Sequence, residues 1–245
     1  MKVLFVAGEV APFSASTQAA HLARDLPEHL QEHAGIETRI IMPRYGTVSE
    51  RRNRLHEVIR LSGSDISVGE TTETLKVKVA SIPGIRLQVY FMDNVHYFKR
   101  KGIFRDRKTE ALFEDNAERA LYFGRAALTT VENLGWAPDV VHAVGWIAGY
   151  VPALLSGEFA GRDLFGGVKT VYTPDDAGVD VRLTADQAAA YGLHADAADR
   201  EVREVGAATA DAVASGEPGT GGPTLDGEPH EIAERAAAFY RDLVA

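Results

Sequence analysis

Two groups of polar and aromatic residues follow predicted strands, at the edge where ligands bind in open parallel sheets. Residues 9–14 (EVAPFS) come after a first buried strand, and His142 ends another, with Trp146 four residues later. An indole can stack on a sugar ring, and imidazole groups form directional hydrogen bonds with hydroxyls. Alternatively, Trp146 closes the core at the start of a helix and His142 satisfies a buried backbone group. The residue types alone leave both interpretations open.

Three other patterns could carry chemistry, and each also has a simpler interpretation. Asp175 and Asp176 could pair as acid and base, although Thr-Pro-Asp-Asp-Ala-Gly after a strand is typical of a turn. His29, Glu32 and His33 match the spacing of an inverted zinc-protease motif, although they flank a leucine stripe where a solvated helix face is expected. The stretch GEPGTGG lacks the Gly-Lys-Ser/Thr of a phosphate-binding loop and indicates a linker. We therefore expect no metal ion and no cofactor.

Short apolar runs alternate with amphipathic stretches along the first part of the chain. The pattern predicts strands at residues 2–6, 38–42, 139–143 and 168–172, a hairpin at 75–79 and 87–92, and helices at 17–33, 113–134 and 147–155. After Pro174 it predicts helices at 184–191, 197–208 and 229–244 and a last strand at 211–214. This alternation is typical of an α/β fold with a mostly parallel sheet and helices on both faces.

The composition excludes several classes of protein. The chain has 245 residues, no cysteine and a net charge of -9, so disulfide scaffolds, thiolate zinc sites and cysteine nucleophiles are excluded. Residues 174–245 carry 5 basic and 15 acidic side chains, and no basic patch favours a nucleic-acid partner. No apolar run approaches the length of a membrane span, and the N-terminus does not have the pattern of a signal peptide. We expect a cytoplasmic protein without a membrane partner.

Seven blocks of residues, in an order and spacing typical of one family, carry a resemblance to it. The blocks are EVAPFS (9–14), LPEHL (26–30), MPRYG (42–46), VYFMDN (89–94), Phe98-x-Arg100-x-Gly102-x-Phe104, FEDNAERALYFGRAAL (113–128) and WAPDVVH (136–142), followed by Trp146 and Pro152. Together they resemble the N-terminal domain of bacterial glycogen synthases and plant starch synthases over residues 1–172. ATADAVASGEP (208–218) is similar to the last strand of that domain. The resemblance implies a Rossmann-like fold, one half of a GT-B glycosyltransferase, in a lineage that extends α-1,4-glucan from ADP-glucose or UDP-glucose.

The chain departs from the family pattern in three loops. Where the family has Lys-x-Gly-Gly-Leu-Ala-Asp, which serves the donor phosphates and the reacting sugar, residues 15–21 read ASTQAAH. The second His-Asp of the family's His-x-His-Asp-Trp is replaced by Val144 and Gly145, and Thr-Ile-His-Asn is replaced by residues 173–176, TPDD. The resemblance and these departures together imply that the chain does not transfer glucose alone.

We interpret residues 1–214 as a synthase-like domain, 215–228 as a flexible linker and 229–245 as a C-terminal helix within an acidic helical extension. The first hypothesis is that the domain binds an α-glucan, a sugar phosphate or a small sugar at the carboxyl ends of the strands. Its candidate ligand-binding residues are Glu9, Phe13, Ser14, Tyr45, Asn94, Tyr97, His142 and Trp146. The second is one half of a split transferase, completed by a partner chain with a nucleotide-sugar domain. The third is an enzyme with repurposed chemistry that uses Asp175 and Asp176.

Overall fold

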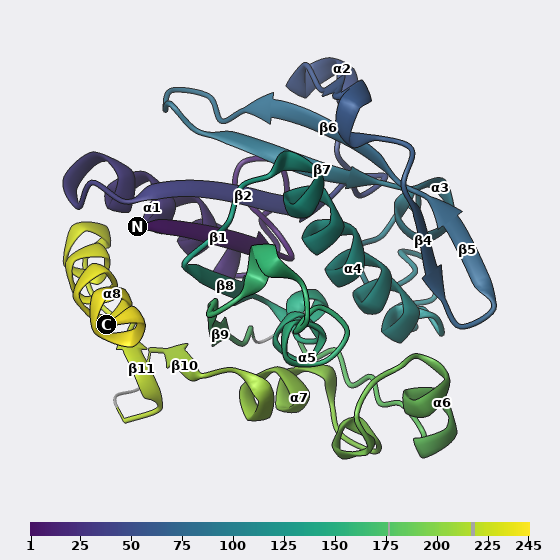
Figure 1. Ribbon diagram of the computed structural model, residues 1–245. Helices are drawn as coiled ribbons and strands as arrows, with labels where there is room; N and C mark the ends of the chain where they lie inside the picture. Colours follow the sequence, from purple (N-terminus) through teal and green to yellow (C-terminus); the bar gives the residue numbers. More distant parts are fainter. Residues whose placement is uncertain (176, 217–218) are drawn as a thin grey trace.

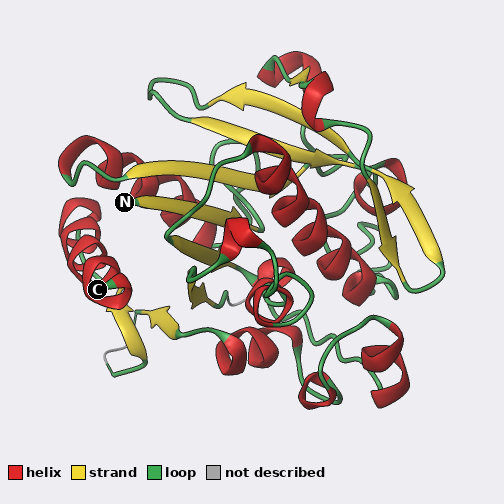
Figure 2. Cartoon of the chain, viewed as in Figure 1, coloured by secondary structure: helices red, strands yellow, loops and turns green. Residues whose placement is uncertain are grey.

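In the computed structural model, which describes residues 1–175, 177–216 and 219–245, a nine-stranded sheet runs through the centre (Figures 1 and 2). Strand β6 is antiparallel to both of its neighbours, and every other neighbouring pair is parallel. The strands in sheet order are β11 (Gly221–Thr224), β10 (Ala212–Ser215), β9 (Lys169–Thr173), β8 (Val140–Val144), β1 (Lys2–Ala7), β2 (Glu37–Pro43), β7 (Gln88–Asp93), β6 (Lys76–Ser81) and β3 (His56–Glu57). This is the mostly parallel α/β sheet that the sequence predicts.

Helices and a small hairpin surround the sheet (Figure 2). The helices are α1 (Ala19–His33), α2 (Glu50–Asn53), α3 (Val95–Phe98), α4 (Asn116–Leu134), α5 (Val151–Ser156), α6 (Ala185–Ala190), α7 (Val202–Thr209) and α8 (Pro229–Val244). Short 3-10 turns are η1 (Ile59–Leu61), η2 (Trp146–Ala148), η3 (Asp163–Phe165) and η4 (Ala195–Ala197). Strands β4 (Asp65–Val68) and β5 (Thr71–Thr74) form a separate antiparallel hairpin. No helix in the described residues is long and apolar enough to cross a membrane.

The two faces of the sheet are covered by different helices. Thr38 of β2 donates a hydrogen bond of 3.2 Å to a carbonyl of α1, so α1 lies on the face of Thr38. Met92 of β7 lies on the opposite face, because its neighbour Phe91 pairs with Met42 on the α1 face and side chains alternate along a strand. Thr130 of α4 contacts the Met92 sulfur at 3.3 Å. Helices α1 and α4 therefore cover opposite faces, as in a doubly wound fold, and α8 packs beside α1.

Local sequence explains where the long helices begin and end. Helix α4 buries a continuous apolar stripe and ends at Gly135, whose φ of 64° favours glycine. Helix α8 begins with a capping box in which Glu228 and Glu231 each accept a hydrogen bond from the other's backbone N–H, and Pro229 occupies the first helical turn. Capping residues therefore determine where α4 ends and where α8 begins.

The structure differs from the sequence-based expectation in several segments, and in place of one helix at 197–208 it has the turn η4 and the helix α7. The helix predicted at 147–155 is divided into η2 and α5. Gly149, between them, lies against α7, where a Cβ would be 2.5 Å from the Val202 carbonyl oxygen. Residues 215–228, predicted as a flexible linker, contain strand β11, which extends the sheet beside β10. A Cβ at Gly222 would be 2.4 Å from the Val213 carbonyl oxygen, so glycine permits this close pairing.

Candidate functional site

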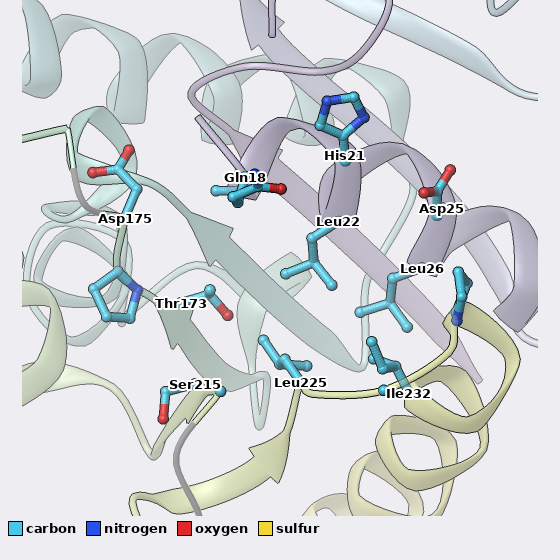
Figure 3. Close-up of a pocket in the computed structure, with 15 residues that line it drawn as sticks. Gln18, His21, Leu22, Asp25, Leu26, Thr173, Asp175, Ser215, Leu225 and Ile232 are labelled. Carbon is cyan, nitrogen blue, oxygen red and sulfur yellow. The ribbon is translucent and has the colours of Figure 1, made fainter. Parts of the chain in front are cut away.

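A cavity of about 520 Å³ lies at the carboxyl ends of β9 and β10, between α1, α8 and the loop after β11 (Figure 3). We call it the strand-end pocket. Its polar wall comes from the first turns of α1 and from the ends of the two strands, and its apolar wall comes from α1, the loop after β11 and α8. The residues used in the argument below are Gln18, His21, Leu22, Asp25, Thr173, Asp175, Ser215, Leu225 and Ile232. Segments far apart in the chain therefore build one cavity.

The electrostatics of the strand-end pocket do not favour an anion. Its described lining contains two carboxylates, Asp25 and Asp175, and no lysine or arginine. The Asp25 carboxylate pairs with Arg24, its neighbour on α1. The Asp175 carboxylate accepts hydrogen bonds from the backbone N–H groups of Trp146, at 3.1 Å, and Ala177, at 3.4 Å. Hydroxyl, amide and imidazole groups beside an apolar wall suit a neutral ligand rich in hydroxyl groups.

His142 lies behind the pocket and is fully buried. Its Nε2 is 2.7 Å from the Thr173 hydroxyl, and its Nδ1 is 2.6 Å from the Tyr240 hydroxyl of α8. Burial lowers the pKa of His142 from its ordinary value of 6.5 to about 3, so the imidazole is neutral. The ring holds Thr173 in place and joins α8 to the sheet, and it presents no nitrogen to a ligand in the pocket.

The candidates in the loop after β1 hold that loop together. The Glu9 carboxylate accepts hydrogen bonds from the Ser14 hydroxyl, from the Ser16 backbone N–H at 3.1 Å and hydroxyl at 2.5 Å, and from the Thr17 hydroxyl at 3.4 Å. Phe13 packs edge-on against a phenylalanine of β7 with 5.0 Å between the ring centroids. Glu9, Phe13 and Ser14 are all buried. In this conformation these side chains organise the loop.

The candidates near α3 are also buried. The Tyr45 hydroxyl donates to the Gly8 carbonyl at 2.9 Å, and burial raises the pKa of Tyr45 above its usual range. Asn94 accepts the Tyr97 backbone N–H at 3.0 Å, which caps α3. The centroid of the Tyr97 ring lies 4.7 Å from that of the Tyr122 ring, and burial raises the pKa of Tyr97 to about 12. Asn94 lines a second cavity, which is separate from the strand-end pocket.

Trp146 begins η2 beneath the strand ends and is 4% exposed. Its indole meets Phe104 edge-on with 6.2 Å between the ring centroids. The indole therefore presents no open face for stacking on a sugar in this conformation. Asp175 lines the strand-end pocket and binds the start of η2, whereas Asp176 lies outside the described residues.

Sequence reasoning pointed to the edge of the sheet at which this pocket lies, but the predicted residues do not include most of the pocket lining. None of the eight candidate ligand residues lines the strand-end pocket, although Thr173 connects it to His142. The residues that were missed include Gln18, His21, Asp25, Leu225 and Ile232. Gln18, His21 and Asp25 are spaced three and four residues apart, which places them on one face of a helix. This spacing was the sequence pattern from which they could have been identified. As for the zinc motif, no group of three potential metal ligands forms among the described residues.

Comparisons with known proteins point to one family. The family described as starch synthase catalytic domain matches residues 2–214. Glycogen synthase of Chlorobium limicola is 42% identical over 172 residues, which are 70% of this chain and 35% of that protein. Glycogen synthase of Chlorobaculum tepidum is 39% identical over 172 residues, which are again 70% of this chain and 35% of that protein. This chain thus spans about a third of the length of these curated relatives.

A solved structure has the same fold. The catalytic domain of starch synthase IV from Arabidopsis thaliana, bound to ADP and acarbose, matches with a TM-score of 0.68 and 20% identity. The match covers 87% of this chain and 44% of the plant protein. The Rossmann-like half of a GT-B fold expected from the sequence is therefore confirmed.

Proposed function

The chain belongs to the family of starch synthase catalytic domains, and we propose that it binds an α-glucan or a small neutral sugar in the strand-end pocket without completing glucosyl transfer by itself. The observation that carries the proposal is the chemistry of the described pocket lining: hydroxyl, amide and imidazole groups stand beside an apolar wall, without a cation. Sugars offer hydroxyls to such groups and C–H faces to such walls. The pocket also lies where ligands bind in open α/β sheets.

The residues that the family uses for the donor support the second part of the proposal. A nucleotide-sugar carries a diphosphate, which needs cationic side chains or closely approaching backbone N–H groups. In the family pattern a lysine and paired glycines supply them, and this chain has Ala15, Thr17 and Gln18 at those places. The polar pair of the next family motif is replaced by Val144 and Gly145, and Val144 is buried. Specific donor binding by these 245 residues is therefore not expected.

Binding of the purified chain tests the proposal directly. Isothermal titration should find weak binding of maltooligosaccharides and none of ADP-glucose or UDP-glucose, and labelled glucose should not be incorporated into glycogen. Binding of a nucleotide-sugar, or incorporation of glucose, would contradict the inference that the altered loops no longer bind the glucosyl donor. Absence of binding by any maltooligosaccharide would contradict the sugar-binding function itself.

A second candidate function is that of one half of a split glucosyltransferase. The observation that favours it is the contrast between the family match over residues 2–214 and the replaced donor-binding residues at Ala15, Thr17 and Gln18. A partner chain with a nucleotide-sugar domain would then supply the donor. Mixing this chain with such a domain should restore incorporation of labelled glucose, and a mixture without activity or complex formation would exclude this candidate.

A further inference from the structure

A second cavity of about 430 Å³ opens beside the carboxyl ends of β2 and β7, next to the β4–β5 hairpin. Among its described lining residues, cationic side chains outnumber carboxylates by four to three, the reverse of the strand-end pocket. We call it the edge cavity. The charged residues that define it are Arg44, Lys76, Lys78 and Lys99, with Glu50, Glu73 and Asp93.

Four of these charges form a closed network at the floor of the edge cavity. The Lys78 ammonium lies 2.8 Å from Glu50 Oε2 and 2.8 Å from Asp93 Oδ2. Arg44 binds the other oxygen of Glu50 through a terminal nitrogen, and its Nε lies 3.8 Å from Asp93 Oδ1. Arg44, Lys78 and Asp93 are nearly buried, with side chains 9%, 12% and 11% exposed. The two cations are therefore held in fixed positions.

Glu50 differs from the other members of the network because its side chain is much more exposed. It begins the four-residue helix α2, and its side chain is 42% exposed. The hydrogen bond from Lys78 lowers the pKa of Glu50, so the group remains an anion. Its two oxygens bridge Arg44 and Lys78 as two oxygens of a bound phosphate would. Glu50 is thus the member of the network that a ligand could displace.

The remaining charges leave the edge cavity suited to a further anion. Glu73 accepts a hydrogen bond of 3.0 Å from Asn94 and lies 3.8 Å from His96. Lys76 and Lys99 are exposed, and no described carboxylate lies within ion-pair distance of either. An oxyanion with three oxygens could place two on Arg44 and Lys78 and direct the third toward these lysines.

We propose that the edge cavity is a binding site for a small phosphate oxyanion, either inorganic phosphate or the phosphate group of a sugar phosphate, and that Glu50 occupies the place of that group until the ligand displaces it. The volume of the cavity is sufficient for a monosaccharide attached to the phosphate. Arg44 and Lys78 supply the charge-assisted hydrogen bonds, and Lys76 and Lys99 attract the anion to the opening. The site is separate from the strand-end pocket, so phosphate binding in the edge cavity can be tested independently of glucan binding in the strand-end pocket.

Titration of the full chain at low ionic strength tests this proposal, with inorganic phosphate, glucose 1-phosphate and neutral maltose as probes. Glu50→Gln keeps the size of the side chain but removes the competing charge, so phosphate affinity should rise about fivefold or more, because charge-assisted hydrogen bonds are roughly twice as strong as neutral ones. Lys99→Gln should weaken binding without disturbing the buried network. The control is Glu114→Gln, which removes one exposed carboxylate away from the edge cavity.

Each outcome decides the question. Tighter phosphate binding by Glu50→Gln but not by Glu114→Gln supports the site, and a further gain with glucose 1-phosphate over inorganic phosphate identifies a sugar phosphate as the ligand. Equal gains in both variants would show general electrostatic attraction and overturn the proposal. Loss of thermal stability in Glu50→Gln without any phosphate binding would show that Glu50 is only a structural ion-pair partner. Binding of maltose in place of the two phosphates would also overturn it.

Discussion

Asp175 places a carboxylate oxygen where a side chain at position 145 would begin: a Cβ on Gly145 would lie 2.8 Å from Asp175 Oδ2. The same oxygen accepts the Trp146 backbone N–H, so it fixes the turn that leads into η2. In the family pattern, an aspartate stands at position 145 and a histidine at position 175. The two loops that depart from the family pattern are therefore linked by direct contact in the structure.

This linkage predicts a double-mutant result. Gly145→Ala should destabilise the protein by about 1–3 kcal/mol, because alanine is strained at a φ of 84° and its Cβ meets Asp175. In an Asp175→Ala background the contact is absent, so the same substitution should cost less. Urea unfolding of the two single variants and the double variant measures this coupling. Equal costs in both backgrounds would show that the backbone conformation alone determines the effect.

The contact between Tyr240 and His142 predicts that α8 contributes to stability through one hydroxyl. Tyr240→Phe should cost about 1–3 kcal/mol, since it leaves a buried imidazole nitrogen without its partner. Tyr150→Phe is the matched control, because the Tyr150 hydroxyl is buried and has no hydrogen-bond partner among the described residues. Thermal and urea unfolding should therefore separate the two variants. A similar loss in both would contradict the specific role of the Tyr240 hydroxyl.

The depressed pKa of His142 predicts a loss of stability in mild acid. The unfolded chain takes up a proton near pH 6.5, whereas the folded protein does so only near pH 3. The contribution is therefore complete above pH 6.5 and falls as the pH decreases, by about 1.4 kcal/mol per pH unit. Unfolding free energies between pH 7 and 5 measure this slope. His142→Gln should reduce it, and His56→Gln, which removes an exposed histidine, serves as the control.

If the unfolding free energy of His142→Gln depends on pH as steeply as that of the wild type, the acid sensitivity comes from other groups. Both variants remove one histidine, so a difference between them isolates the effect of burial. His142 is the suitable probe because both of its ring nitrogens are engaged inside the protein.

The central strands could be predicted because their apolar runs are continuous and bounded by turn residues. Val140, for example, is fully buried within β8, as the run at 139–143 indicates. Strand β11 could not be predicted, since Gly221, Gly222 and Pro223 have low strand propensity. The segment pairs with β10 where Gly222 allows close approach of the two backbones. Tertiary contacts therefore determined the structure of this segment.

The buried strand assignment also gives a stability prediction. Val140→Asp should prevent folding, because it places an unpaired charge between β1 and β9, where the side chain has no access to solvent. Asp139→Asn is a milder change at the preceding residue. It removes the charge of the side chain that accepts a hydrogen bond from the Lys2 backbone N–H but keeps an acceptor oxygen. Circular dichroism melts should show a cooperative transition for Asp139→Asn and none for Val140→Asp. A wild-type transition in Val140→Asp would refute the burial of β8.

The candidate site was harder to predict than the fold. Family motifs identified Tyr45 and Trp146, yet their side chains stabilise the core beneath the strand ends. The pocket above them depends on α8 and the loop after β11, where the family resemblance gave no guidance. Gln18 and Leu225 are separated by most of the chain, and no local pattern connects them. The site therefore required the three-dimensional arrangement.

The last prediction distinguishes the strand-end pocket from stacking on Trp146. Gln18→Ala with His21→Ala removes polar groups that line the pocket, so maltooligosaccharide affinity should fall about threefold to tenfold, the worth of one typical hydrogen bond. Glu32→Ala, on an exposed part of α1, is the control. Trp146→Phe keeps an aromatic ring in the core and should leave affinity unchanged, because the indole is covered by Phe104. If Trp146→Phe weakens binding while the double variant does not, the sugar binds at the tryptophan and the loop above it must open.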